Sequence, residues 1–300
     1  MKVSELKGSP GMLGLYCKAA LPLIPGASIL PFVGGSGREI PELELRLSGV
    51  QSDLDRLAAY AKVCGFTLRN ELPGTYPHVL AFPLHMALMT DSAFPFGAVG
   101  LVHIENRIEV HQPIGSDQPL DLRVRATALQ EHPKGKSFSI LTDALVDGRS
   151  VWSESSTMLR RGPSSAPKTA GEKNDQSTPA MQSGAFSSQW ALSGDLGRRY
   201  AAVSGDRNPI HMHALSAKLF GFPSAIAHGM WSLARCLAAL EGELPDCFTA
   251  EVRFGAPILL PAKVNFTETV TDGGVQIRLA GKDGAKTHLS ATVKTKESER

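Results

Sequence analysis

The chain has 300 residues, of which 42% are hydrophobic and 20% charged, and its formal net charge is +2. This length can bury the core of one large or two medium domains, and the composition is typical of an ordinary globular protein. Acidic and basic residues are interspersed, so nothing predicts a nucleic-acid partner or an anionic membrane surface. Lys18, Pro22 and Pro25 interrupt the mildly apolar N-terminal stretch. It therefore predicts neither a membrane span nor a signal peptide, and we expect a cytoplasmic protein.

The N-terminal half predicts helical segments followed by strands. A helical pattern covers residues 52–64, and after a loop a second, buried helix is expected to begin at Phe82–Pro83. Its continuation to Gly97 is apolar and rich in methionine, which is typical of ordinary core packing. Alternating β-type runs separated by turn signals then cover residues 100–110, 120–131, 137–146 and 150–160.

A segment of different composition comes next. Residues 163–184 are rich in Ser, Pro, Gly, Lys and Gln and hold almost no large apolar side chain. Such a segment cannot bury enough surface to offset the entropy of ordering it, so it predicts a flexible linker. The linker divides the chain into domains at residues 1–162 and 185–300.

The C-terminal half repeats the order of elements. Helical patterns cover residues 195–203 and 228–240, and β-type runs cover residues 248–258, 262–272, 274–283 and 286–296. Strands that follow a helix without further alternating helices predict an α+β fold, in which an antiparallel sheet wraps around a helix.

Three short segments recur in both halves, in the same order and at similar separations. They predict an internal duplication. The matching pairs are Tyr60–Phe66 with Tyr200–Asp206, Tyr76–Met86 with Phe222–Ser232, and Ile108–Ile114 with Val252–Ile258.

The segment YAAVSGDRNPIHMHA, residues 200–214, carries the candidate chemistry. Asp206 and His211 are five residues apart, and Pro209 restricts both itself and Asn208. A carboxylate and an imidazole that share one water molecule form a general acid/base pair, and Asn208 can fix their geometry by hydrogen bonding. From the residues alone the plainer alternative stays open, because Asp or Asn before Pro is a common helix N-cap.

The N-terminal copy supplies an internal comparison. There Phe66 stands in place of Asp206, and Pro83 stands in place of Gly229. Gly229 at a helix start would offer a free backbone N–H along the positive end of the helix dipole, which can stabilise an oxyanion, whereas Pro83 has no N–H. The comparison favours a catalytic C-terminal copy and a degenerate N-terminal copy.

These residues resemble the hydratase motif of the MaoC-like, (R)-specific enoyl-CoA hydratases, Y-x-x-x-S-G-D-x-N-P-I/L-H followed by an alanine. The segment AHGM (residues 227–230) is similar to the one that opens the family's central helix. The resemblance implies a tandem, double hot-dog fold. It also implies hydration of trans-2-enoyl-CoA, or dehydration of (R)-3-hydroxyacyl thioesters, by Asp206 and His211. Gly229 would hold the thioester oxygen and Asn208 would support the pair. Residues 82–97 of the degenerate copy would form an apolar wall of the tunnel for the acyl chain.

The partner that the resemblance implies is an acyl thioester of coenzyme A or of acyl carrier protein, with no cofactor. His211 and His213 form an H-x-H pair without further ligands, so we expect no metal site. Two alternatives remain at this stage, a hot-dog acyl-CoA thioesterase and a non-catalytic acyl-thioester-binding protein. Two hot dogs in one chain allow either a monomer or a homodimer.

Overall fold

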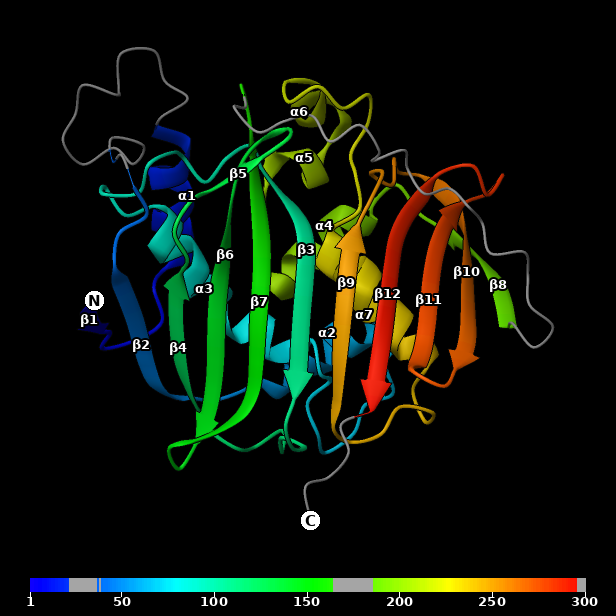
Figure 1. The fold of residues 1–300 in the computed structure, drawn as a ribbon, viewed down its shortest axis with the longest axis horizontal. Coiled ribbons are helices and arrows are strands. Elements are labelled where there is room, and N and C mark those ends of the chain that lie inside the picture. Colours follow the sequence, from blue (N-terminus) through cyan, green and yellow to red (C-terminus); the bar gives the residue numbers. More distant parts are fainter. Residues whose placement is uncertain (22–36, 38, 164–185, 296–300) are drawn as a thin grey trace.

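The computed structural model describes residues 1–21, 37, 39–163 and 186–295. Its strands form one twelve-stranded sheet, with α2, α3, α4 and α7 on one face (Figure 1). The linker expected at residues 163–184 lies, except for residue 163, outside the described residues. In the described part of the chain, no helix is long and apolar enough to cross a membrane.

The described part of the N-terminal half contains ten elements. Its helices are α1 (Met12–Ala20), α2 (Leu54–Cys64) and α3 (Tyr76–Met89). Its strands are β1 (Lys2–Glu5), β2 (Leu43–Val50), β3 (Leu101–Val110), β4 (Leu120–Ala126), β5 (Gln130–His132), β6 (Gly135–Val146) and β7 (Arg149–Arg161). The sequence predicted α2, β3, β4, β6 and β7, and it missed α1, β1 and β2.

The C-terminal half has the same plan. Its helices are α4 (Leu196–Ser204), the short α5 (Pro209–Met212) and α6 (Ala214–Lys218), and α7 (Gly229–Ala239). Its strands are β8 (Phe186–Leu192), β9 (Phe248–Phe254), β10 (Ala262–Thr271), β11 (Gly274–Gly281) and β12 (Thr287–Thr295). Apart from β8, all of these strands were predicted.

Strand order shows the duplication. One half runs β2-β4-β6-β7-β3 and the other β8-β10-β11-β12-β9, so each position in one half has its counterpart in the other. The halves join where β3 pairs antiparallel with β9, with Ile108 opposite Ala250. Two helix-on-sheet units thus share one continuous sheet, as the double hot-dog expectation requires.

The expected start of the second helix in the N-terminal half is wrong. Helix α3 begins at Tyr76, and Pro83 lies in its interior. Twelve of its 14 residues are buried, and burial on all sides lets tertiary packing tolerate a proline within the helix. The N-terminal half therefore has no helix start at the position of Gly229, and the additional turns carry His78 into the centre of the protein.

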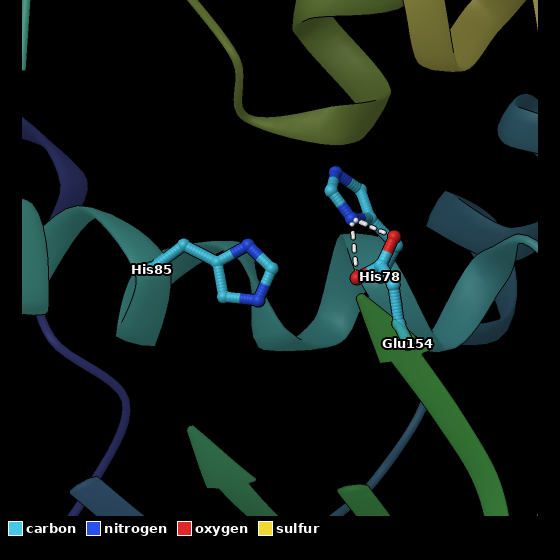
Figure 2. A group of neighbouring side chains, drawn as sticks. All are labelled: His78, His85 and Glu154. Carbon is cyan, nitrogen blue, oxygen red and sulfur yellow. Dashed lines mark hydrogen bonds and ion pairs between the residues drawn. The ribbon is translucent and has the colours of Figure 1, made fainter. Parts of the chain in front are cut away.

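A charged group interrupts the apolar core of the N-terminal half. The carboxylate of Glu154 on β7 accepts a hydrogen bond from Nδ1 of His78 on α3, at 2.9 Å from both oxygens (Figure 2). Asn106 on β3 donates to the same carboxylate at 2.6 Å. Seven residues after His78, Nε2 of His85 is 2.7 Å from the hydroxyl of Thr142.

Candidate active site

The candidate loop begins at a glycine that ends helix α4. Gly205 has φ +85°, in the left-handed region that glycine enters without a steric penalty. Gly65 ends α2 in the same way, with φ +87°. The two copies therefore make the same turn, and the next residue differs: Phe66 in one and Asp206 in the other.

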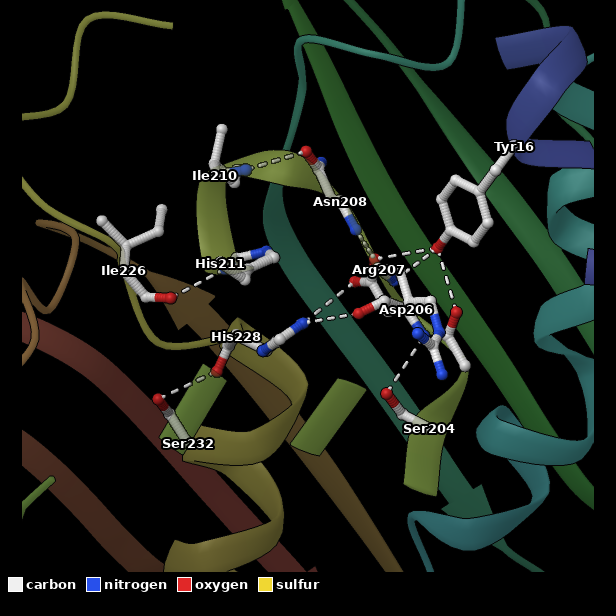
Figure 3. Close-up of polar contacts among 11 residues, drawn as sticks. Tyr16, Ser204, Asp206, Arg207, Asn208, Ile210, His211, Ile226, His228 and Ser232 are labelled. Atoms are coloured by element: carbon white, nitrogen blue, oxygen red, sulfur yellow. Dashed lines mark hydrogen bonds and ion pairs between the residues drawn. The ribbon is translucent and has the colours of Figure 1, made fainter. Parts of the chain in front are cut away.

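Asp206 is held as a carboxylate by its neighbours. Its Oδ1 accepts a hydrogen bond from the backbone N–H of Asn208 at 3.0 Å, and its Oδ2 is 3.7 Å from Nε2 of His228 (Figure 3). Burial alone would raise the pKa of Asp206, but the imidazoles of His228 and His211 and the N–H of Asn208 lower it below its usual value. The side chain is therefore ionised at neutral pH.

Tyr16 reaches the loop from helix α1 of the other half. Its hydroxyl donates to the carbonyl of Gly205 at 3.0 Å and accepts from the backbone N–H of Arg207 at 2.5 Å. It is also 3.5 Å from Oδ1 of Asp206. Tyr16 was not predicted as a site residue, because about 190 residues separate it from the loop and no local pattern marks it.

His211 is buried with a defined tautomer. Its Nδ1–H donates to the carbonyl of Ile226 at 2.8 Å, which leaves Nε2 as a proton acceptor. Burial lowers the pKa of His211 below 6.5, although Asp206 and the carbonyl of Ile226 work in the opposite direction. A Cβ on Gly197 of α4 would come within 2.0 Å of the carbonyl oxygen of His211, so only glycine allows this close approach.

His228 completes the group and was not predicted as a site residue. Its ring stacks on that of His211, with centroids 3.6 Å apart, and its Nε2–H donates to the carbonyl of Asp206 at 3.0 Å. Burial and the neighbouring His211 lower the pKa of His228 to about 3, so the ring is neutral. Its position directly before Gly229 was the one signal in the sequence.

The structure places Asn208 and Gly229 beside this group. Asn208 is the N-cap of α5 and accepts from the N–H of Ile210 at 3.4 Å, so the plainer interpretation of a cap is correct for this residue. It also lines the cavity, as does Gly229, the first residue of α7. The N–H of Gly229 has no partner within the helix and lies at the positive end of its dipole.

One cavity connects the two halves. Asp206, His211 and Gly229 line it from the C-terminal half, and Phe82 and Met89 line it from α3. The expected apolar wall of residues 82–97 thus contributes to the cavity through its helical part.

Among the described residues, two groups of three have ligand atoms close enough to hold a metal ion. They are Asp206, His211 and His228, and His78, His85 and Glu154, with ligand atoms within 4.8 Å of one another in each group. His213, the second histidine of the H-x-H pair, is exposed and belongs to neither. Neither group was predicted from the sequence as a possible set of metal ligands.

The arrangement combines groups that can transfer a proton with a helix N–H that can polarise a carbonyl oxygen. Two groups within 4.8 Å of each other can both bond one water molecule, since each such bond is about 2.8 Å long. An ionised carboxylate, a neutral imidazole with a free acceptor nitrogen and a helix N–H are the parts needed to add water to a conjugated double bond or to remove it.

Comparison with known proteins identifies the family. The MaoC like domain family matches residues 175–294. The 3-hydroxyacyl-thioester dehydratase X of Mycobacterium tuberculosis is 37% identical over 278 residues, which cover 92% of this chain and 94% of that protein. The chain belongs to the MaoC-like dehydratase family. This MaoC-like protein is therefore an enzyme of the hydro-lyase class.

Solved structures share the fold of this chain. The crystal structure of HtdX from Mycobacterium tuberculosis matches this MaoC-like chain with a TM-score of 0.73 and 36% identity, over 84% of this chain and 100% of that one. A MaoC-like dehydratase from Phytophthora capsici, 19% identical, shares the fold with a TM-score of 0.68 over 86% of this chain and 97% of that one. A Mycobacterium tuberculosis protein described as a double hot dog has a TM-score of 0.55 at 12% identity, over 86% of this chain and 96% of that one.

Proposed function

We propose that this enzyme interconverts (R)-3-hydroxyacyl thioesters and trans-2-enoyl thioesters by removing or adding water. The observation that carries the proposal is the shared cavity, where ionised Asp206 and neutral His211 lie with the free helix N–H of Gly229. The name of the Mycobacterium tuberculosis relative, a 3-hydroxyacyl-thioester dehydratase, supports the substrate class. The (R) configuration rests on the resemblance of the loop motif.

In the hydration direction, Asp206 and Nε2 of His211 bind one water molecule. His211 accepts its proton while the hydroxide oxygen bonds to C3 of the enoyl group. The electrons of the double bond move onto the thioester oxygen, where the N–H of Gly229 stabilises the enolate. C2 then takes a proton from the same pair. Dehydration runs the same steps in reverse.

The neighbours hold these groups in place. Tyr16 and Asn208 fix the loop that carries Asp206, and the carbonyl of Ile226 fixes the tautomer of His211. Protons and one water molecule balance the reaction, so it needs no cofactor. The thioester is that of coenzyme A or of acyl carrier protein.

The test measures the loss of enoyl absorbance with purified protein on CoA and carrier-protein thioesters, in the wild type and in Asp206→Asn. Asn keeps the shape and the acceptor for Asn208 but removes the charge, and we expect a loss of about 10²- to 10⁴-fold in kcat. His211→Asn should lose activity similarly, whereas His213→Asn, on the exposed histidine of the same motif, should not. Full activity of Asp206→Asn, or equal consumption of (R)- and (S)-3-hydroxyacyl thioesters, would contradict the proposal.

A further inference from the structure

The proposed reaction centre has two parts that lie on different elements. The loop after α4 carries Asp206 and His211, whereas the N–H of Gly229 belongs to the first residue of α7. Hydration needs both parts at once, because water adds at C3 while negative charge collects on the thioester oxygen. A misplacement of about 1 Å between reacting groups can cost about 10²-fold in rate. The loop and the start of α7 must therefore keep a fixed relation.

His228 joins the loop to the start of α7. It immediately precedes Gly229, and its backbone carbonyl accepts from the N–H and the hydroxyl of Ser232 at 3.1 and 3.2 Å. Its side chain does not cap the helix. Instead its Nε2–H donates to the backbone carbonyl of Asp206 at 3.0 Å, and the same nitrogen is 3.7 Å from Oδ2 of that residue (Figure 3). The backbone of His228 is thus fixed by α7, and its side chain is fixed by the loop.

The ring of His228 also contacts the second member of the acid/base pair. It lies against the ring of His211, with centroids 3.6 Å apart and 24° between the ring planes. The ring of Tyr200 on α4 is close as well, with its centroid 4.8 Å from that of His228. All three residues are buried, so the ring of His228 cannot turn without displacing a neighbour.

His228 itself is not placed to exchange protons with a substrate. A carbonyl oxygen only accepts hydrogen bonds, so Nε2 of His228 carries the proton that is donated to Asp206. Nδ1 is inaccessible to solvent and has no hydrogen-bond partner among the described residues. Neither nitrogen is therefore free to bind a water molecule in the cavity, and the side chain acts through its neighbours.

The N-terminal copy differs on both sides of this contact. In the matched segments Phe82 stands in place of His228, and Phe66 stands in place of Asp206. The copy that lacks the carboxylate therefore also lacks the N–H donor, although it keeps an aromatic ring at that position. This joint difference favours a role for the N–H of His228 that is tied to Asp206.

We propose that His228 is a positioning residue, which holds the loop of Asp206 and His211 at a fixed distance from the N–H of Gly229. The role rests on the proposed function, since it requires both parts to act on one thioester. The hydrogen bond from Nε2 fixes the backbone of Asp206, and the stacked ring fixes His211. Loss of that hydrogen bond lets the loop move relative to α7. The chemical step then slows, while binding of the acyl chain by the cavity walls changes little.

Two substitutions separate the N–H of His228 from its ring. His228→Phe keeps a ring against His211 and removes the donor, whereas His228→Gln loses the ring and keeps an N–H near the position of Nε2. We expect His228→Phe to lower kcat about tenfold or more and to leave KM within about threefold of the wild-type value. His228→Gln should restore most of the lost kcat.

The matched control is Leu233→Ala, one turn further along α7. Leu233 is fully buried and does not belong to the residues that line the cavity. Its truncation should lower the melting temperature and leave kcat unchanged. The control therefore separates a loss of stability in α7 from a loss of position in the loop.

A double-mutant cycle with Gly229→Pro tests the positioning directly. Proline has no N–H, so Gly229→Pro removes the group relative to which the loop is held. In that background His228→Phe should lower kcat by no more than about threefold, against about tenfold or more in the wild type. A side chain that only supports the fold would cost the same factor in both backgrounds.

The rates are followed by enoyl absorbance at saturating substrate, and thermal melts check that each variant is folded. Should His228→Phe fail to fold, His228→Asn, whose amide ends short of the position of Nε2, takes its place. Wild-type kcat in the variant without the donor, a lower kcat in His228→Gln than in His228→Phe, or equal losses in both backgrounds would overturn the positioning role and leave the proposed function standing. No turnover of any thioester by the wild type would refute the proposed function, and this role with it.

Discussion

The backbone N–H of Gly229 can be removed without removing the helix that carries it. Proline has no N–H and is favoured at the first position of a helix, the position that Gly229 holds in α7. The preceding residue, His228, has φ −69° and ψ 140°, a conformation that a residue before proline adopts readily. Gly229→Pro should therefore fold, and its helix should begin at the same residue.

Any side chain at this position meets Phe254. An added Cβ would lie 3.1–3.3 Å from three ring carbons of Phe254, so the ring must shift by a few tenths of an ångström. Gly229→Ala introduces the same Cβ but keeps the N–H, which makes it the matched control. The difference in kcat between the two variants then measures the effect of replacing the N–H by the proline ring.

We expect kcat of Gly229→Pro to be about 10²- to 10³-fold below that of Gly229→Ala, which corresponds to about 2.7–4 kcal/mol of transition-state stabilisation. The assay follows enoyl absorbance at saturating substrate, because a poorer fit of the ground state raises KM and a lost oxyanion contact lowers kcat. Thermal melts of both variants check that they are folded. Equal kcat values in two folded variants would refute the role of this N–H.

Three further results follow from the geometry. Tyr16→Phe removes the hydroxyl that bonds Gly205 and Arg207. We therefore expect the free energy of unfolding to fall by about 1 kcal/mol and kcat/KM to fall roughly tenfold. Wild-type rates in this variant would show that α1 does not hold the loop. Because burial keeps the pKa of His211 below 6.5, its neutral, proton-accepting form persists in mild acid. The acidic limb of the pH profile of kcat/KM should then lie below pH 6.5, and a limb above it would contradict the assigned role. Burial lowers the pKa of His85 to about 3, so below pH 6.5 the unfolded chain binds a proton that the folded chain does not, and stability declines with falling pH. His85→Gln should flatten that decline in melts at several pH values, and an unchanged slope would show that His85 does not cause it.

Short-range patterns in the sequence determined much of the architecture. Alternating apolar residues marked β3, β4, β6 and β7 and their counterparts β9 to β12, because one buried face gives a strand its period of two. Recurring segments marked the duplication, and the strand order bears it out. The missed strands β1, β2 and β8 lie at or next to the outer edges of the sheet, where a strand has fewer neighbours to impose a buried pattern.

The start of helix α3 shows where local rules fail. Proline is favoured in the first turn of a helix and disfavoured inside one, so the sequence places the start at Phe82–Pro83. Burial of nearly every residue of α3 outweighs that preference, and the helix begins at Tyr76. Because the helix begins earlier than expected, His78 lies on it and lines the cavity.

Some residues of the candidate site could be predicted from the sequence, and others could not. Asp206, Asn208, His211 and Gly229 were predicted from the sequence, because the first three lie in one short loop and the duplication supplied a copy that lacks the loop. His228 and Tyr16 could not be predicted in this way. The tertiary fold stacks the ring of His228 on that of His211, and it places Tyr16 of α1 in contact with the loop. The ion pair of His78 with Glu154 joins residues 76 positions apart. The sequence by itself determined which residues can act with near neighbours along the chain. Only the tertiary structure decided which residues act with partners from another helix or strand, because those contacts depend on how the elements pack.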